Sequence, residues 1–140
     1  MKKEGIWNAE LAQIVASCGH GKTIVINDAG FPIPKGVPVI DLAVCRGIPR
    51  FMDVLQAILS ELVVEEYYLA KPMQSVNPED YRFVTHLLKK QKHEEISQKE
   101  LVERAKEAIV CIRTGEDRPY CNLILRSASC AGVFVEQYAI

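Results

Sequence analysis

No apolar run in the 140 residues approaches the length of a membrane-spanning helix. The charged start, Met1 to Glu4, is not followed by the apolar stretch that a secretory signal carries. We therefore expect a cytoplasmic protein that has no membrane partner.

A surplus of positive charge is also missing. The 17 Lys and Arg residues are balanced by 18 Asp and Glu residues, which leaves a net charge of −1. Proteins that bind nucleic acids usually carry a basic surplus, because they must neutralise phosphates. We expect no nucleic-acid partner.

The cysteines lack the spacing of a metal site. There are five of them, an odd number, and no two form a C-x-x-C pair. This pattern favours neither a disulfide framework nor bound zinc.

A complete phosphate-binding loop is missing as well. Gly21-Lys22-Thr23 matches the end of that motif, but the glycine required five positions before Gly21 is Ala16. The elements expected here run helix, loop, strand, whereas a phosphate-binding loop joins a strand to a helix. We interpret Gly19 as a helix C-cap and do not expect nucleotide binding.

What the sequence does contain is an alternation of helical and β patterns. Helix starts are predicted by Asn8 as an N-cap, Pro49 in a first turn, Asn77-Pro78 as cap and first residue, and Ser97 with Glu100 as a capping box. Apolar and β-branched runs predict strands at residues 23–26, 37–43, 63–70, 108–112, 120–125 and 132–135. The polar residues 89–95 are expected to form a connection.

This alternation predicts an α/β fold: a three-layer α/β/α single domain over residues 1–140 with a mixed β-sheet. Pro38 favours an edge position for the strand at 37–43. The strands at 120–125 and 132–135 are joined by a connection too short for a helical crossover. We therefore expect that pair to be antiparallel.

The strand at 23–26 has a titratable group near each end. His20 lies in a Gly-His-Gly loop that leaves its ring accessible, and near neutral pH a histidine both takes and gives protons. Asp28 lies at the carboxyl end of the strand, where α/β folds bind ligands. Taken alone, His20 is better explained as a loop residue beside a helix end. Asp28 is equally well explained as an Asx-turn with Gly30.

Tyr120 and Asn122 flank Cys121 in a predicted strand, so alternation directs both side chains to one face. A phenol and an amide together suit hydrogen bonds to sugar hydroxyls. An edge strand that shows polar groups to water explains them equally well. The charged residues just before them are interpreted as a solvated cluster: Arg113, Glu116 and Arg118.

Short segments spaced through nearly the whole chain add a more specific signal. They are Gly19-His20, Asp28 to Pro34, Ile40 to Ala43, Pro49 to Phe51, Ile112 to Glu116, Pro119 to Asn122 and Ala131 to Val133. Taken in this order, they resemble the D-ribose pyranase / L-fucose mutarotase family (RbsD/FucU), and its ribose branch in particular.

The resemblance implies an isomerase of sugar uptake that interconverts the pyranose and furanose forms of ribose without a metal or an organic cofactor. It also implies a homo-oligomer of pentameric rings stacked as a decamer, with each site formed between neighbours. By position, His20 is the catalytic acid/base and Asp28 binds the sugar. Tyr120 and Asn122 contact the sugar from the adjoining subunit, and Cys121 contributes backbone between them.

The sequence departs from the family pattern at several places. Gln98 stands where ribose pyranases carry a second, sugar-binding histidine, and glutamine forms hydrogen bonds but does not titrate. Cys121 replaces the usual alanine, residues 126–130 resemble an insertion, and residues 136–140 extend past the usual end. These differences leave open a mutarotase for L-fucose or another monosaccharide, or a non-catalytic sugar-binding subunit.

Overall fold

The computed structural model describes residues 1–129 of the chain, so the strand expected at 132–135 lies outside the described residues. The helices are α1 (Ala9–Ser17), α2 (Phe51–Leu59), α3 (Met73–Val76), α4 (Pro78–Leu87) and α5 (Gln98–Ala105). The strands are β1 (Thr23–Asn27), β2 (Val39–Asp41), β3 (Val64–Ala70), β4 (Lys92–Ile96), β5 (Val110–Arg113) and β6 (Leu123–Ser127). Within residues 1–129, every helix is too short or too polar to cross a lipid bilayer.

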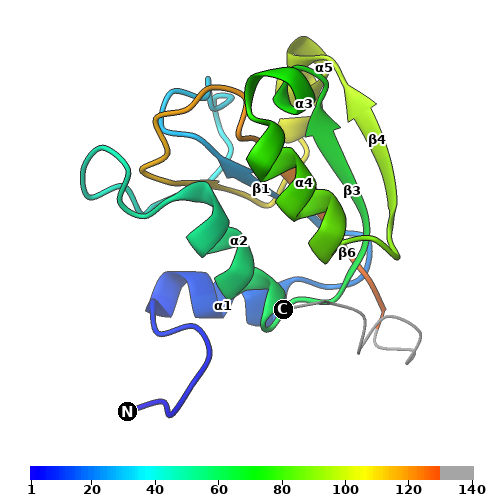
Figure 1. Ribbon diagram of the computed structural model, residues 1–140. Coiled ribbons are helices and arrows are strands. Elements are labelled where there is room, and N and C mark those ends of the chain that lie inside the picture. Colours follow the sequence, from blue (N-terminus) through cyan, green and yellow to red (C-terminus); the bar gives the residue numbers. More distant parts are fainter. Residues whose placement is uncertain (130–140) are drawn as a thin grey trace.

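The strands form one mixed sheet in the order β2-β5-β1-β6-β3-β4 (Figure 1). Strand β5 pairs in parallel with β1 and β2, and β3 pairs in parallel with β4. Strand β6 lies between β1 and β3 and runs antiparallel to both. The mixed sheet is therefore confirmed, and β2 occupies the edge position that Pro38 predicted.

Each face of the sheet is covered by its own apolar core, which confirms the three-layer arrangement. Along β1, Ile24 and Ile26 pack in the core that includes α1, α2 and α4, whereas Val25 packs in the core that includes α5. Strand alternation produces this division. Strand β1 is therefore buried on both faces. The residues before it and after it lie at opposite ends of the strands.

The helix starts follow the predicted local chemistry. The side chains of Asn8 and Ser97 each accept a backbone N–H from the following first turn, at 2.9 and 3.1 Å. These contacts satisfy N–H groups that have no partner within the helix. Pro78 is the first residue of α4, as predicted, but the Asn77 side chain donates to the Pro119 carbonyl instead of capping the helix.

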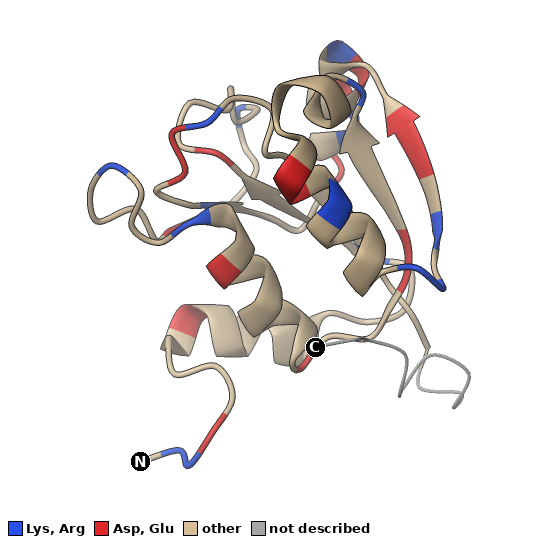
Figure 2. Ribbon diagram, viewed as in Figure 1, with Lys and Arg blue, Asp and Glu red and all other residues tan. Residues whose placement is uncertain are grey.

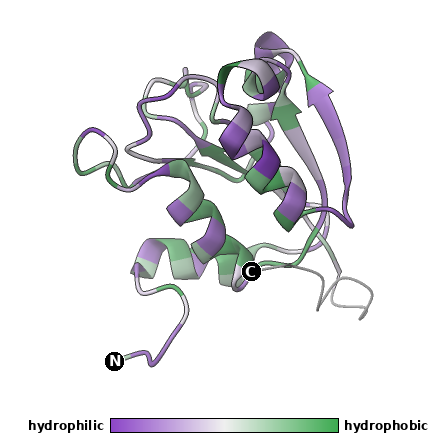
Figure 3. Cartoon of the chain, viewed as in Figure 1, coloured by the Kyte–Doolittle hydropathy of each residue, from purple (hydrophilic) through white to green (hydrophobic). Residues whose placement is uncertain are grey.

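Strand β4 occupies residues that were expected to form a connection, and that prediction was wrong. The strand lies at the edge of the sheet with its first three side chains exposed, so its sequence carries no apolar alternation. Figures 2 and 3 show it as a charged, hydrophilic strand beside the more apolar β3. Backbone pairing with β3 and the stacking of His93 on Tyr67, at 5.0 Å between ring centroids, hold it in place.

Several element boundaries also differ from prediction, and two of them concern residues near the site. Helix α2 begins at Phe51 with Arg50 as its N-cap, so Pro49 precedes the helix instead of lying in its first turn. The strand expected from residue 120 begins at 123, because the backbone of Tyr120 has a φ of +64° and forms a turn. Tyr120 and Asn122 therefore do not share a face of a strand. Both nevertheless lie near Asp28.

Candidate active site

A pocket of about 320 Å³ lies at the carboxyl end of β1. Asp28 directly follows β1, and Tyr120 lies in the turn before β6. Because β6 is antiparallel to β1, the start of β6 lies beside the end of β1. The pocket is lined by Asp28, Ala29, Gly30, Phe31, Pro32, Gln98, Glu116, Asp117, Pro119 and Tyr120.

The Asp28 carboxylate is held in a fixed position by the residues around it. Asn122 accepts the backbone N–H of Asp28 at 2.9 Å and donates its amide to the Asp28 carboxylate at 3.3 Å. The backbone N–H of Gly30 donates to the same carboxylate at 3.1 Å. Asp28 thus forms the Asx-turn with Gly30 and also lines the pocket, and its role in ligand binding stays a prediction.

The environment of Asp28 shifts the pKa of its carboxyl group. Burial raises the pKa of the Asp28 carboxyl, while hydrogen bonds from the Gly30 backbone, the Asn122 side chain and the Tyr120 backbone lower it, and burial prevails. A carboxyl group that is partly desolvated and oriented by fixed donors is well placed to bind the hydroxyl groups of a polar ligand.

Gln98, the first residue of α5, lines the pocket and carries an unused hydrogen-bond acceptor. Its Oε1 atom is buried and has no hydrogen-bond partner among the residues that the structure describes. A buried acceptor without a partner is costly, and a ligand hydroxyl in the pocket would satisfy it. The sequence-predicted residues Asp28, Gln98, Tyr120 and Asn122 therefore lie together within one chain.

A buried ion network supports the loop that carries Tyr120. Glu116, which is fully buried, binds Arg118 at 2.8 Å and Arg50 at 3.0 Å, and Arg118 also binds the buried Asp80 at 2.8 Å. The backbone carbonyl of Glu116 accepts the N–H of Ala29, beside Asp28, at 2.9 Å. Burial acts to raise the pKa of Glu116, but hydrogen bonds from Arg118, its charge and Arg50 lower it to about 2.

Glu116 and Arg118 were interpreted from the sequence as a solvated cluster, and that interpretation was wrong. No periodic pattern marks a buried carboxylate in a turn, because one of its two arginine partners, Arg50, lies 66 positions away in the sequence. Asp80 on α4, which binds Arg118, also gave no signal, since an acidic residue in the first turn of a helix is ordinary.

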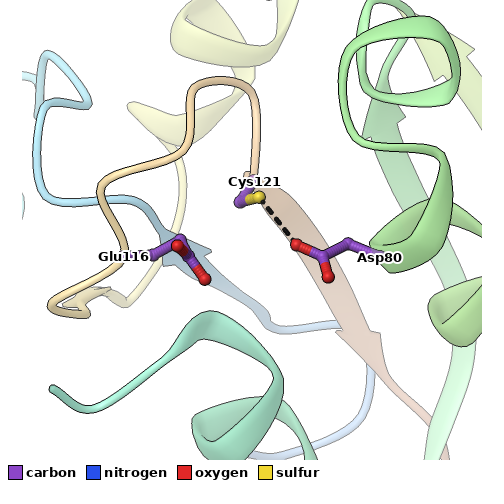
Figure 4. Close-up of side chains that lie close together, drawn as sticks. All are labelled: Asp80, Glu116 and Cys121. Carbon is purple, nitrogen blue, oxygen red and sulfur yellow. Dashed lines mark hydrogen bonds between the residues drawn. The ribbon is translucent and has the colours of Figure 1, made fainter. Parts of the chain in front are cut away.

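The same network contains three side chains of types that bind metal ions. Side-chain atoms of Asp80, Glu116 and Cys121 lie within 4.8 Å of one another (Figure 4). The Arg118 guanidinium already binds both carboxylates at 2.8 Å. Burial, together with a hydrogen bond to Asp80, raises the pKa of the Cys121 thiol, which donates to Asp80 at 3.1 Å. A protonated thiol and two carboxylates neutralised by arginine do not fit a metal ion.

His20 lies near the opposite end of β1 from Asp28. It precedes β1, its side chain is 60 % exposed, and its Nε2 atom lies 3.2 Å from the Glu65 carboxylate. The five residues of β1 span about 16 Å, so one chain does not bring His20 to the Asp28 pocket. Within one chain, Tyr120 and Asn122 lie beside Asp28 and His20 lies apart from them, whereas the resemblance groups His20 with Asp28; the division of the site between subunits stays a prediction.

Residues 1–130 match the RbsD / FucU transport protein family. The chain belongs to this family. Among RbsD/FucU relatives, the D-ribose pyranase of Coprothermobacter proteolyticus is 50 % identical over 127 residues, which are 91 % of this chain and 97 % of the relative. The D-ribose pyranase of Geobacillus thermodenitrificans is 46 % identical over 91 % of this chain and 96 % of its own length.

Solved RbsD/FucU structures have the same fold. Bacillus subtilis RbsD complexed with D-ribose matches with a TM-score of 0.88 and 41 % identity, over 91 % of this chain and 98 % of that one. The fucose mutarotase of Streptococcus pneumoniae in complex with L-fucose matches with a TM-score of 0.68 and 21 % identity, over 91 % and 98 %. The second match supports the fold alone.

Proposed function

We propose that this protein is a D-ribose pyranase, an isomerase that interconverts the pyranose and furanose forms of ribose. The observation that carries the proposal is the Asp28 pocket, which lies in a fold that matches ribose-bound Bacillus subtilis RbsD with a TM-score of 0.88. Relatives named D-ribose pyranase match over nearly their full length, which supports the same activity.

In this proposal the pocket binds the sugar through hydrogen bonds. The Asp28 carboxylate accepts from sugar hydroxyls, the free Oε1 of Gln98 accepts another, and the Tyr120 phenol either donates or accepts. Asn122 is occupied by its two bonds to Asp28, so it also acts by holding that carboxylate in place. Cys121 contributes its backbone, because its thiol is turned toward Asp80.

His20 is the proposed proton carrier. Its imidazole takes the proton of the anomeric hydroxyl, the bond from the anomeric carbon to the ring oxygen breaks, and the ring oxygen receives a proton as the open aldehyde forms. Reclosure through a different hydroxyl reverses these transfers and yields the other ring size. The reaction has no net gain or loss of protons, so one histidine and fixed hydrogen bonds are sufficient.

The proposed site needs two copies of the chain. Because His20 and Asp28 lie near opposite ends of β1, the His20 that serves a pocket must come from a neighbouring subunit. Closed rings repeat such a contact around the whole assembly. We extend the proposal to pentameric rings stacked as a decamer in the cytoplasm, as the resemblance implies.

One observation favours a second candidate. Gln98 occupies the position of the sugar-binding histidine of ribose pyranases. This difference changes a side chain that lines the proposed sugar pocket. A mutarotase for L-fucose or another monosaccharide is therefore the alternative. A sugar-binding subunit without turnover is the other possibility that a rate measurement must address.

Exchange NMR at equilibrium tests these proposals. Pyranose–furanose exchange of D-ribose is measured with no protein, with the wild type and with His20→Ala, and anomer exchange of L-fucose is measured in parallel. We expect the wild type to accelerate ribose exchange and His20→Ala to lose about 100-fold or more of that acceleration. Acceleration of L-fucose anomer exchange alone would support the alternative. If the protein binds ribose but the exchange rate stays at its spontaneous value, catalysis is contradicted.

A further inference from the structure

Glu65 on β3 contacts His20 at the end of the sheet away from the Asp28 pocket. The Oε2 atom of Glu65 lies 3.2 Å from Nε2 of His20. A carboxylate offers acceptors alone, so Nε2 carries the proton in this contact. Within residues 1–129, Glu65 forms no other ion pair, and Nδ1 of His20 has no hydrogen-bond partner.

The path of β3 explains how Glu65 reaches the histidine. In the pairing of β3 with β6, Val64 lies opposite Ser127 and Glu66 lies opposite Arg126, so Glu65 is an extra residue in the ladder. The cores agree with this register, because Val64 and Tyr67 share one face of the sheet although they are three positions apart. A β-bulge of this kind redirects a side chain, and bulges are frequent beside active sites.

We propose that Glu65 is a positioning residue for His20. It keeps the proton on Nε2 and fixes the ring, which leaves Nδ1 as the basic nitrogen for the sugar. When Nδ1 takes the proton of the anomeric hydroxyl, the O–H bond breaks and an N–H bond forms. The Glu65 carboxylate then balances the charge of the imidazolium until Nδ1 returns that proton to the ring oxygen. This inference rests on the proposed function of His20.

The contact has the features of an arrangement for proton transfer and few features of a stabilising one. The His20 side chain is 60 % exposed and Glu65 is 26 % exposed, and an exposed ion pair contributes little to stability. His20 lies on a turn between two glycines, Gly19 and Gly21, neither of which packs against other atoms at its Cβ position. Without Glu65, the ring has no side-chain hydrogen bond from residues 1–129 to fix its orientation.

The experiment compares the full-length wild type with Glu65→Ala, Glu65→Gln and Glu66→Ala. Glu66 is a matched control, because it is adjacent on β3, is 27 % exposed and pairs with Arg126 instead of His20. Two quantities are measured: kcat and KM for ribose exchange, and the imidazole Nε2–H proton signal of His20 in NMR spectra, assigned with His20→Gln. Without a hydrogen bond, this exposed proton exchanges with water too fast to be observed.

We expect Glu65→Ala to lower kcat about tenfold with KM unchanged, because Glu65 does not touch the sugar. The Nε2–H signal should be visible in the wild type, lost in Glu65→Ala, and retained in Glu65→Gln, whose amide oxygen still accepts. Glu66→Ala should match the wild type in both measurements. A Glu65→Ala protein with wild-type kcat and an intact signal would overturn the proposal.

Two further outcomes separate a failure of this proposal from a folding defect and from a failure of the proposed function. If Glu65→Ala does not fold, the absence of the Nε2–H signal in the wild type would overturn the proposal by itself, and its presence in the wild type and in Glu65→Gln would support it. If the wild type does not accelerate ribose exchange, the proposed function fails. In that case the NMR signal still reports whether Glu65 holds the His20 ring.

Discussion

Asn122 binds Asp28 at two points, through the backbone N–H at 2.9 Å and the carboxylate at 3.3 Å. The two residues are 94 positions apart and are brought together by the pairing of β1 with β6. Both are buried. This amide therefore joins the two sides of the pocket and sets the direction of the carboxylate.

Asn122→Ala should lower the free energy of unfolding by about 1–3 kcal/mol, because the buried N–H of Asp28 loses its acceptor. It should also raise KM for ribose, since the carboxylate is no longer oriented. Urea unfolding and exchange NMR measure the two effects. Asn8→Ala is the control: it removes the cap of α1, should cost about 1 kcal/mol and should leave KM unchanged.

Gln98→Ala should raise KM for ribose about fivefold with kcat nearly unchanged, because one hydrogen bond contributes about 1 kcal/mol to binding. Gln98→His restores a donor and acceptor of the kind that ribose pyranases carry, so it should keep KM near the wild-type value. Kinetics on both variants test the role of the free Oε1. An unchanged KM in Gln98→Ala would remove Gln98 from the site.

Acid should destabilise the protein partly through Glu116. Its pKa in the folded state is about 2, below the ordinary value of 4.5, so the native state favours the ionised form. The resulting stabilisation is complete above about pH 4.5 and is lost as the pH falls through about 2. Glu116→Gln should make the unfolding free energy less dependent on pH in this window. Equal slopes for the wild type and the variant would contradict this assignment.

The cysteines should react with alkylating reagents in an order set by exposure. Cys45 is exposed, whereas Cys111 and Cys121 are buried. Burial raises the pKa of Cys111 to about 11 and also raises that of Cys121, so both remain thiols at neutral pH. Among the cysteines within residues 1–129, peptide mass spectrometry should find Cys45 labelled first, and Cys111 and Cys121 labelled only after denaturation. Rapid native labelling of Cys121 would show that the ion network opens.

Much of the fold follows from local patterns in the sequence. Asn8 and Ser97 marked their helices because capping depends on neighbouring residues, and the apolar run of β1 marked a buried central strand. Strand β4 was missed because backbone pairing with β3 and the stacking of His93 on Tyr67 hold it in place, and neither leaves an apolar period in the sequence.

The candidate site was predictable in part for similar reasons. Asp28 was identifiable from its place after a buried strand, and Asn122 from its pairing with Tyr120 as an amide beside a phenol, although the strand face that the two were expected to share does not form. Their direct contact was not, since it depends on a register between distant segments. No pattern in the sequence indicated Glu65, because a β-bulge has no signature here. His20 lies too far from the pocket for one chain to complete the proposed site.

The most direct test of the shared site is the activity of mixed assemblies. His20→Ala and Asp28→Asn chains, each inactive alone, are co-expressed with different tags, and assemblies that contain both are purified. If His20 and Asp28 of one site come from different subunits, random assembly leaves about a quarter of the sites intact, and ribose exchange should return to about that fraction of the wild-type rate. Mixed assemblies as inactive as either variant alone would contradict a site shared between subunits.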